Sequence, residues 1–170
     1  GLDISIIGIP KTIDNDISYV ERSFGYQTAV SIAQEVLQTG HEEARGAYNG
    51  VAVVKLMGRH SGFIAAMAAV ANGDANFVLV PEVPFEIDGG NGFLSALGKR
   101  LEERHHALVV VAEGAGQDIF TDESGEPKRD ASGNVKLADI GIYLRDCIAD
   151  RFKSGWNAAT VKYIDPSYMI

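Results

Sequence analysis

The chain has 170 residues, 46% of them apolar, and a formal net charge of −8. It is long enough to bury one hydrophobic core, and its acidic balance argues against a nonspecific grip on nucleic acid or on an anionic membrane, which would need concentrated Lys and Arg. No apolar run reaches the length that spans a bilayer. The single Cys147 cannot form an internal disulfide and fits a reducing compartment, so we expect a cytoplasmic protein.

Apolar runs of strand length alternate with stretches of helical period along the chain. We expect strands at Ile4–Ile9, Val51–Leu56, Phe77–Val80, Ala107–Ala112 and Thr160–Ile164. We expect helices at Phe24–Thr39, Ser61–Asn72, Asn91–Arg104 and Ala138–Lys153. Ser23 is a candidate N-cap for the first helix, and the polar stretch at 114–136 predicts a surface loop. The alternation predicts an α/β fold, a parallel sheet flanked by helices on both faces.

The first expected strand ends in the most unusual segment, PKTIDND. Ligands of open parallel sheets bind at the carboxyl ends of strands, and here Pro10 is followed by Lys11, Thr12, Asp14 and Asp16. A lysine supplies charge to phosphoryl oxygens, one carboxylate accepts a proton from an attacking hydroxyl, and another holds a magnesium ion. An Asx turn, in which Asp and Asn only cap backbone groups, explains the same residues about equally well. Both interpretations stay open at this point.

Three further strand ends carry candidate residues. After the second strand, Met57, Gly58 and Arg59 lead into a helix, whose free N–H groups with the arginine would form an anion site; close helix packing explains the glycines equally well. The third strand ends in PEVPF, where Glu82 is as consistent with exposure as with function. After the fourth strand, Glu113 meets a glycine-rich exit, where a carboxylate could accept hydrogen bonds from sugar hydroxyls.

The segments PKTIDND, KLMGRHSGFIA, PEVPF, VVVAEGAGQD and VKYIDPSYMI together resemble the phosphofructokinase family, in that family's order and across almost the whole chain. The phrasing is most similar to the ATP-dependent enzymes of the plant and trypanosomatid type. The resemblance implies the Rossmann-like three-layer domain of that family. It implies that residues 1–22 are the end of the donor-binding domain with the catalytic loop, and residues 23–170 the fructose 6-phosphate-binding domain. The family's GGDGT loop is not in this sequence, so we expect a piece of a longer enzyme, inactive alone.

Residue roles follow from the resemblance motif by motif. It implies that Asp14 is the general base for the sugar's 1-hydroxyl and that Thr12 contacts the transferring phosphate or the sugar. It implies that Lys11 touches the donor phosphates and that Asp16 helps to organise magnesium. The residues that it assigns to fructose 6-phosphate binding, besides Thr12 and Asp14, are Met57, Gly58, Arg59, Glu113 and Tyr163.

The activity implied by the resemblance is 6-phosphofructokinase, a glycolytic phosphotransferase that uses ATP, fructose 6-phosphate and Mg²⁺. Pyrophosphate is the alternative donor, because Lys11 is shared by both groups of enzymes. A non-catalytic sugar-phosphate or nucleotide-binding domain is a further alternative, against which the intact Lys11, Asp14 and Asp16 argue. The family also implies a homo-oligomer, a dimer or tetramer, under allosteric control.

Overall fold

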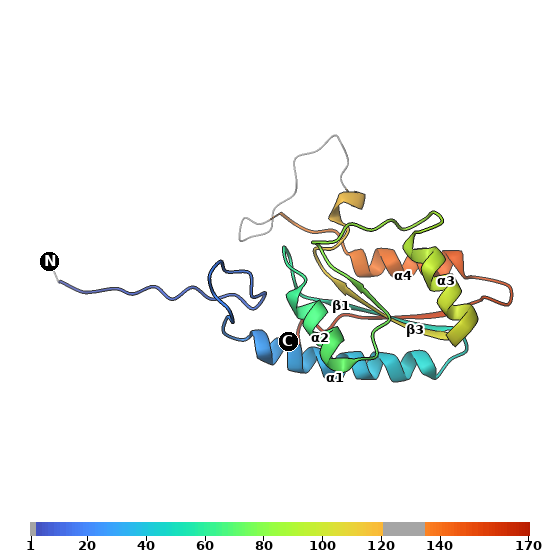
Figure 1. The fold of residues 1–170 in the computed structure, drawn as a ribbon, viewed down its shortest axis with the longest axis horizontal. Helices are drawn as coiled ribbons and strands as arrows, with labels where there is room; N and C mark the ends of the chain where they lie inside the picture. Colours follow the sequence, from blue (N-terminus) through green and yellow to red (C-terminus); the bar gives the residue numbers. More distant parts are fainter. Residues whose placement is uncertain (1–2, 121–134) are drawn as a thin grey trace.

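The structure, a computed structural model, describes residues 3–120 and 135–170. Its four-stranded parallel sheet has the order β2-β3-β1-β4 and comprises β1 (Gly50–Leu56), β2 (Phe77–Leu79), β3 (His106–Ala112) and β4 (Thr160–Ile164). The helices are α1 (Tyr26–Arg45), α2 (Phe63–Asn72), α3 (Phe93–Arg104) and α4 (Ile140–Arg151), with a short 3-10 helix, η1 (Gln117–Phe120), after β3. The parallel α/β fold predicted from the sequence is confirmed, and Figure 1 shows the sheet between two helical layers.

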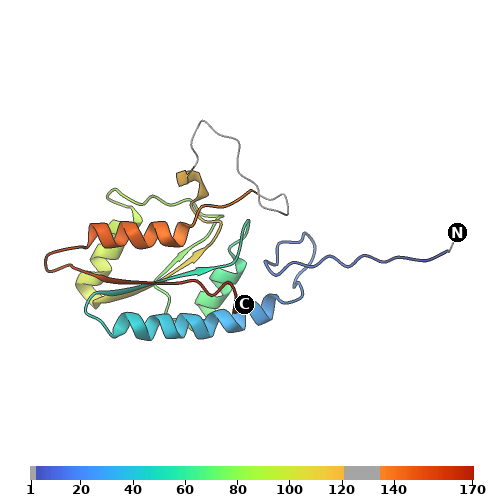
Figure 2. The same ribbon diagram turned by 180° about the vertical axis from the view of Figure 1, so that it is seen from behind.

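Side chains of β1 alternate between two apolar clusters because successive residues of a strand point to opposite faces. Ala52 and Val54 pack with the buried residues of α1 and α2. Val51 and Val53 pack with those of α3 and α4. Figures 1 and 2 show the same division from opposite sides, with one pair of helices on each face of the sheet. This pattern places the next odd-numbered residue of β1, Lys55, on the α3 and α4 face.

Both ends of α1 differ from the prediction. The helix continues past the predicted end at Thr39, because Gly40 packs closely on the sheet; a Cβ at Gly40 would lie 3.2 Å from a methyl group of β1. The N-cap is Gly25, which turns the chain at a φ of 88°. Ser23 accepts the Tyr26 N–H through its carbonyl, and its buried hydroxyl has no hydrogen-bond partner among the described residues. The prediction of Ser23 as the N-cap is therefore wrong.

The strand predicted at Ile4–Ile9 is also wrong. The structure has no strand there, and the segment extends away from the folded body in Figure 1. Ile6 and Ile7 are 89% and 87% exposed. A strand needs a neighbour to pair with, and the described residues supply none for this segment.

The predicted surface loop at 114–136 is wrong in its first residues. Gly114 and Ala115 are buried, and η1 follows them. Residues 121–134 lie outside the described part of the chain. In the described ranges, no helix combines the length and the hydropathy needed to cross a bilayer.

Candidate functional site

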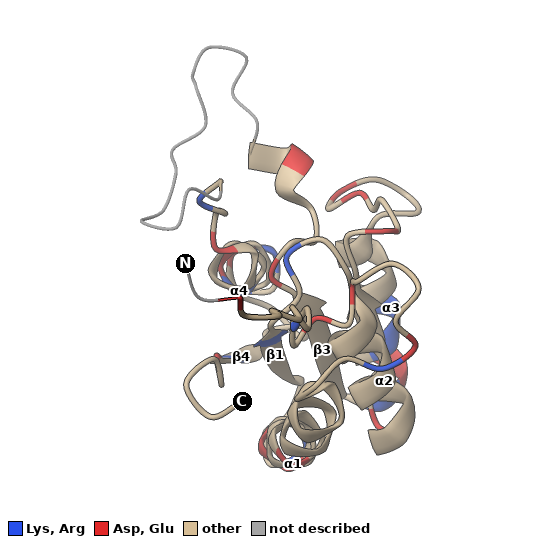
Figure 3. Cartoon of the chain, turned by 90° about the vertical axis from the view of Figure 1, so that its left-hand side faces the viewer, with Lys and Arg blue, Asp and Glu red and all other residues tan. Residues whose placement is uncertain are grey.

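Asp14 lies against the loop that follows β1. The Arg59 N–H donates a hydrogen bond to Asp14 Oδ2 at 3.3 Å, and the Ser61 hydroxyl donates to the Asp14 carbonyl at 3.0 Å. The Asp14 N–H donates to Thr12 Oγ1 at 3.2 Å, which closes the turn. The structure therefore brings two of the motifs found in the sequence together at the carboxyl ends of the strands, the end of the molecule that Figure 3 faces.

The half-buried carboxyl group of Asp14 has a raised pKa. Burial is the main cause, because it penalises the charged form, and the negative charge of Asp16 adds to it. The hydrogen bond from the Arg59 backbone and the positive charge of Arg59 act in the opposite direction without cancelling the rise. A raised pKa brings a carboxylate closer to the range in which a general base works best at neutral pH.

The residues that follow β3 are hydrogen-bonded to the end of β1 and to the loop after it. The Glu113 N–H donates to the Leu56 carbonyl at 2.9 Å, and the Gly114 N–H donates to the Gly58 carbonyl at 3.0 Å. Burial raises the pKa of Glu113; the charge of Arg59 lowers it and that of Asp14 raises it. Two carboxylates and one guanidinium thus share one edge of the sheet.

Gly58 and Arg59 are fixed by local backbone geometry. Gly58 has a φ of 134°, and a Cβ there would lie 2.3 Å from the Ser61 carbonyl oxygen, so only glycine fits. The Arg59 guanidinium donates to the Val135 carbonyl at 2.7 Å. Met57 is half-buried and packs against the α1 and α2 cluster. The backbone of the loop after β1 therefore holds Arg59 in a fixed position.

Three further predicted site residues are Lys11, Asp16 and Tyr163. Lys11 and Asp16 are exposed on the same segment as Asp14. Tyr163, near the end of β4, directs its hydroxyl to the Asp139 carboxylate, with distances of 3.1 and 3.3 Å to the two oxygens. Burial raises the pKa of Tyr163 to about 12, so the hydroxyl stays protonated and serves as a donor.

A charged cluster around Lys55 was missed by reasoning from the sequence. Lys55 Nζ lies 2.9 Å from Asp139 Oδ2 and 2.9 Å from Asp165 Oδ2. Asp139 also caps α4, accepting the Ile142 N–H at 3.1 Å. Burial would raise the pKa of Asp139, but hydrogen bonds from Lys55, Ile142 and Tyr163 outweigh it and lower the pKa. The signal available in the sequence was a lysine inside the apolar strand GVAVVKL, which must find partners when buried.

Glu82 was left undecided by the sequence and caps α2 in the structure. Its two carboxylate oxygens accept the Gly62 N–H at 2.8 and 3.1 Å. A carboxylate at this position satisfies a free N–H group and interacts favourably with the helix dipole. The sequence predicted an anion at the start of this helix. At Gly62 that anion is the Glu82 carboxylate of the chain itself.

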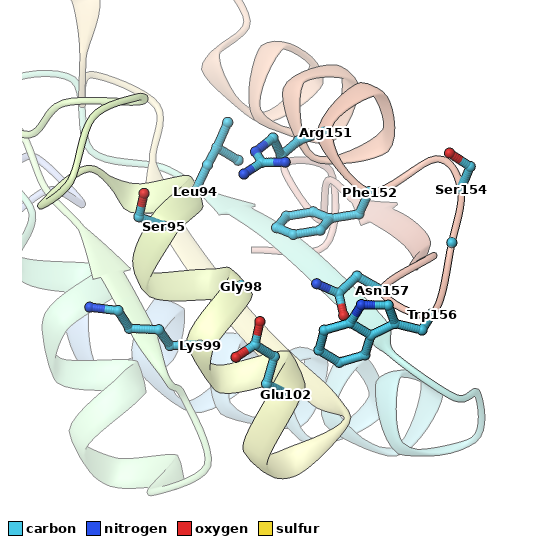
Figure 4. A pocket seen from close by; sticks show the side chains of 11 residues that line it. Leu94, Ser95, Gly98, Lys99, Glu102, Arg151, Phe152, Ser154, Trp156 and Asn157 are labelled. Carbon is cyan, nitrogen blue, oxygen red and sulfur yellow. The ribbon is translucent and has the colours of Figure 1, made fainter.

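None of the candidate residues lines the cavity drawn in Figure 4. This cavity, of about 390 Å³, lies between α3 and the loop after α4, and Arg151 and Trp156 are among its lining residues. The Trp156 carbonyl accepts a hydrogen bond from Asn49, just before β1, which places the loop at the amino ends of the strands. The described residues contain no group of three or more His, Cys, Asp or Glu arranged to hold a metal ion.

The chain matches the Phosphofructokinase family model over residues 1–164. It is 51% identical to the ATP-dependent 6-phosphofructokinase of Amycolatopsis methanolica, over all of this chain and 38% of that protein. It is 49% identical to the enzyme of the same name from Borreliella burgdorferi, over 99% of this chain and 39% of the relative. Identity to ATP-dependent 6-phosphofructokinase 7 of Arabidopsis thaliana is 45%, over 99% of this chain and 35% of the relative. The chain thus spans little more than a third of the length of these relatives.

Solved structures support the fold. A pyrophosphate-dependent phosphofructokinase from Marinobacter aquaeolei superposes with a TM-score of 0.66 at 21% identity, covering 94% of this chain and 36% of that one. The phosphofructokinase of Pichia pastoris in the T-state gives a TM-score of 0.64 at 20% identity, covering 93% of this chain and 14% of that one. With the family match and the relatives above, the chain belongs to the phosphofructokinase family.

Proposed function

We propose that the chain is the sugar-phosphate side of an ATP-dependent 6-phosphofructokinase. This enzyme transfers the terminal phosphoryl group of ATP to the 1-hydroxyl of fructose 6-phosphate and gives fructose 1,6-bisphosphate. The observation that carries the proposal is the hydrogen bond from the Arg59 N–H to Asp14, which joins the base-bearing segment to the loop of the sugar pocket. The names of relatives 45–51% identical favour ATP as the donor.

In this proposal Asp14 accepts the proton of the sugar's 1-hydroxyl as that oxygen attacks the terminal phosphorus. The raised pKa of its carboxyl group suits that role. Thr12 holds the turn through its bond with the Asp14 N–H and contacts the transferring phosphate or the sugar. Lys11, exposed on the same segment, binds the donor phosphates. Phosphoryl transfer relies mainly on such positioning and charge stabilisation.

Asp16 fits the way in which Mg²⁺ is held in phosphoryl-transfer sites. Such sites use one or two carboxylates together with the substrate's phosphates, not a cage built of protein alone. Asp16 is exposed and near enough to Asp14 to affect its pKa, which suits this mode of binding. The ion would neutralise charge on the donor phosphates there.

The sugar pocket in this proposal comprises Met57, Gly58, Arg59 and Glu113, with Glu113 accepting hydrogen bonds from sugar hydroxyls. Tyr163 supports the pocket indirectly, through the hydrogen bond that its hydroxyl donates to Asp139.

We further propose a domain boundary between residues 22 and 23. The lack of any helix or strand in residues 3–22 is consistent with a segment that belongs to another domain. A cytoplasmic dimer or tetramer under allosteric control stays a prediction from the family.

The test is a turnover assay of the full-length protein that carries this chain. With fructose 6-phosphate and Mg²⁺, we expect turnover with ATP as the donor. Turnover with pyrophosphate but not with ATP would overturn the donor assignment. Binding of fructose 6-phosphate without turnover by either donor would instead indicate a non-catalytic domain.

Asp14→Asn tests the assignment of the general base. We expect kcat to fall about a hundredfold or more, since acid-base groups typically contribute that much. Asp150→Asn, which changes an exposed carboxylate on α4, is the control and should leave kcat unchanged. A fall of less than about tenfold in Asp14→Asn would contradict the assignment.

A further inference from the structure

Lys55 holds two carboxylates that come from different parts of the chain. Its Nζ lies 2.9 Å from Asp139 at the start of α4 and 2.9 Å from Asp165 just after β4. The lysine side chain is 13% exposed, against 35% and 33% for the two carboxylates. A charge in this position has to be paired, and here it is paired twice.

Tyr163 completes the cluster on the same face of the sheet. Its hydroxyl donates to Asp139 at 3.1 Å, and its ring centroid lies 6.0 Å from Lys55 Nζ. A Cβ at Gly141 would lie 2.4 Å from the Tyr163 ring, so the glycine in the first turn of α4 makes room for it. We call Lys55, Tyr163, Asp139 and Asp165 the lysine clamp.

The clamp joins two elements to the strand that carries the sugar pocket. Lys55 stands two residues before Met57 on the same strand end. Asp165 begins the segment 165–170 and is itself fixed by hydrogen bonds from the Ser167 N–H and hydroxyl. Along this segment Pro166 is buried and Ile170 packs, partly buried, against the α1 and α2 cluster, while Tyr168 is fully exposed, so burial holds the stretch between them weakly.

We infer that Lys55 is a positioning residue for sugar-phosphate binding: through Asp165 it orients the segment 165–170, and through Asp139 the start of α4, toward the pocket at the carboxyl ends of the strands. This inference rests on the function proposed above. Removing the ammonium group leaves two carboxylates facing one another and frees the segment. The effect falls on binding of the sugar phosphate, since the clamp does not touch the base-bearing segment around Asp14 in any described hydrogen bond or ion pair.

The test uses the full-length protein with Lys55→Met, which keeps the apolar stem and removes the charge. We expect the KM for fructose 6-phosphate to rise about tenfold, with kcat and the KM for ATP within about twofold of wild type. Amide hydrogen exchange should become faster in a peptide covering 160–170 and stay unchanged in one covering β3. Asp150→Asn is the control, because it changes an exposed carboxylate on α4 and should change neither readout.

Two further variants separate positioning from general stabilisation. Lys55→Arg keeps the positive charge between the two carboxylates and should restore part of the affinity. Tyr163→Phe removes one hydroxyl, keeps both ion pairs, and should give a smaller rise in KM; it stands in for Lys55→Met should that variant not fold. An unchanged KM in Tyr163→Phe and Lys55→Met, or faster exchange throughout the sheet, would overturn the inference. If wild type lacks the kinase activity, the proposed function fails, while the exchange experiment still decides whether Lys55 holds the segment.

Discussion

The Arg59 backbone N–H donates a hydrogen bond to the Asp14 carboxylate at 3.3 Å, while the Arg59 guanidinium lowers the pKa of that carboxyl group from a distance. The two influences respond differently to mutation. A side-chain substitution removes the charge and leaves the backbone donor in place. Arg59 can therefore be used to shift the pKa of Asp14 without breaking the contact between the two segments.

The first prediction concerns the pH dependence of turnover. In the proposed function activity requires ionised Asp14, so kcat/KM should fall as the pH drops through the pKa of that carboxyl group, which burial raises above its ordinary 3.8. Arg59→Gln removes a charge that lowers the pKa, so the acid limb of the pH profile should move to higher pH. The profile of kcat/KM in the full-length protein measures this shift. Arg145→Gln should not move the limb, and a shift to lower pH in Arg59→Gln would contradict the prediction.

The second prediction is that Asp14→Asn stabilises the fold at neutral pH while it lowers kcat about a hundredfold or more. A carboxyl group with a raised folded pKa is easier to ionise in the unfolded chain, so it costs stability above its folded pKa. This cost disappears as the pH falls toward the unfolded value, where both states are protonated. Asparagine has no such cost and retains an oxygen that can accept the Arg59 N–H.

Urea unfolding of wild type and Asp14→Asn across a pH series measures this effect. The stability advantage of the variant should be largest near pH 7 and shrink toward pH 4. Asp150→Asn, at an exposed position, should show no such dependence. An advantage that grows on acidification would mean that the raised pKa of Asp14 is wrong.

The core of the fold could be predicted because its signal is local. Apolar runs such as VAVV and LVVV in the chain are buried strands, and each predicted helix is present. The predictions were wrong at places where contacts between residues far apart in the sequence determine the structure. The first helix was predicted to end at Thr39, but Gly40 packs on the sheet and the helix continues. The apolar run at Ile4–Ile9 has the composition of a strand but finds no strand to pair with among the described residues.

The site divides in the same way. Turn residues and glycines marked the segments around Asp14, Gly58 and Glu113, because parallel strands bring their carboxyl ends to one edge. The partners of Lys55 could not be predicted, since Asp139 lies 84 residues away and no local period links the two. Glu82 is exposed in the structure, and its hydrogen bond from the Gly62 N–H joins residues 20 positions apart, so no local signal predicted it.

The third prediction follows from the cap that Glu82 provides to α2. Glu82→Ala should lower the free energy of unfolding by about 1 kcal/mol, the typical cost of losing a side-chain cap. Glu82→Gln keeps an oxygen acceptor and should cost less. Glu86→Ala is the matched control, an exposed glutamate in the same connection, and should have little effect. Equal effects of Glu82→Ala and Glu86→Ala in urea unfolding would show that the cap does not contribute.

The fourth prediction concerns the junction between the exits of β1 and β3. A Cβ at Gly114 would lie 1.9 Å from the Arg59 carbonyl oxygen, a backbone atom that cannot turn aside as a side chain can. Gly114→Ala should therefore cost about 1–3 kcal/mol of stability, the range for forced overpacking, and displace Arg59 enough to raise the KM for fructose 6-phosphate. Gly90→Ala is the control, because a Cβ there meets no atom within 4 Å. If Gly114→Ala matches Gly90→Ala in both urea unfolding and KM, the two exits do not pack as closely as the structure places them.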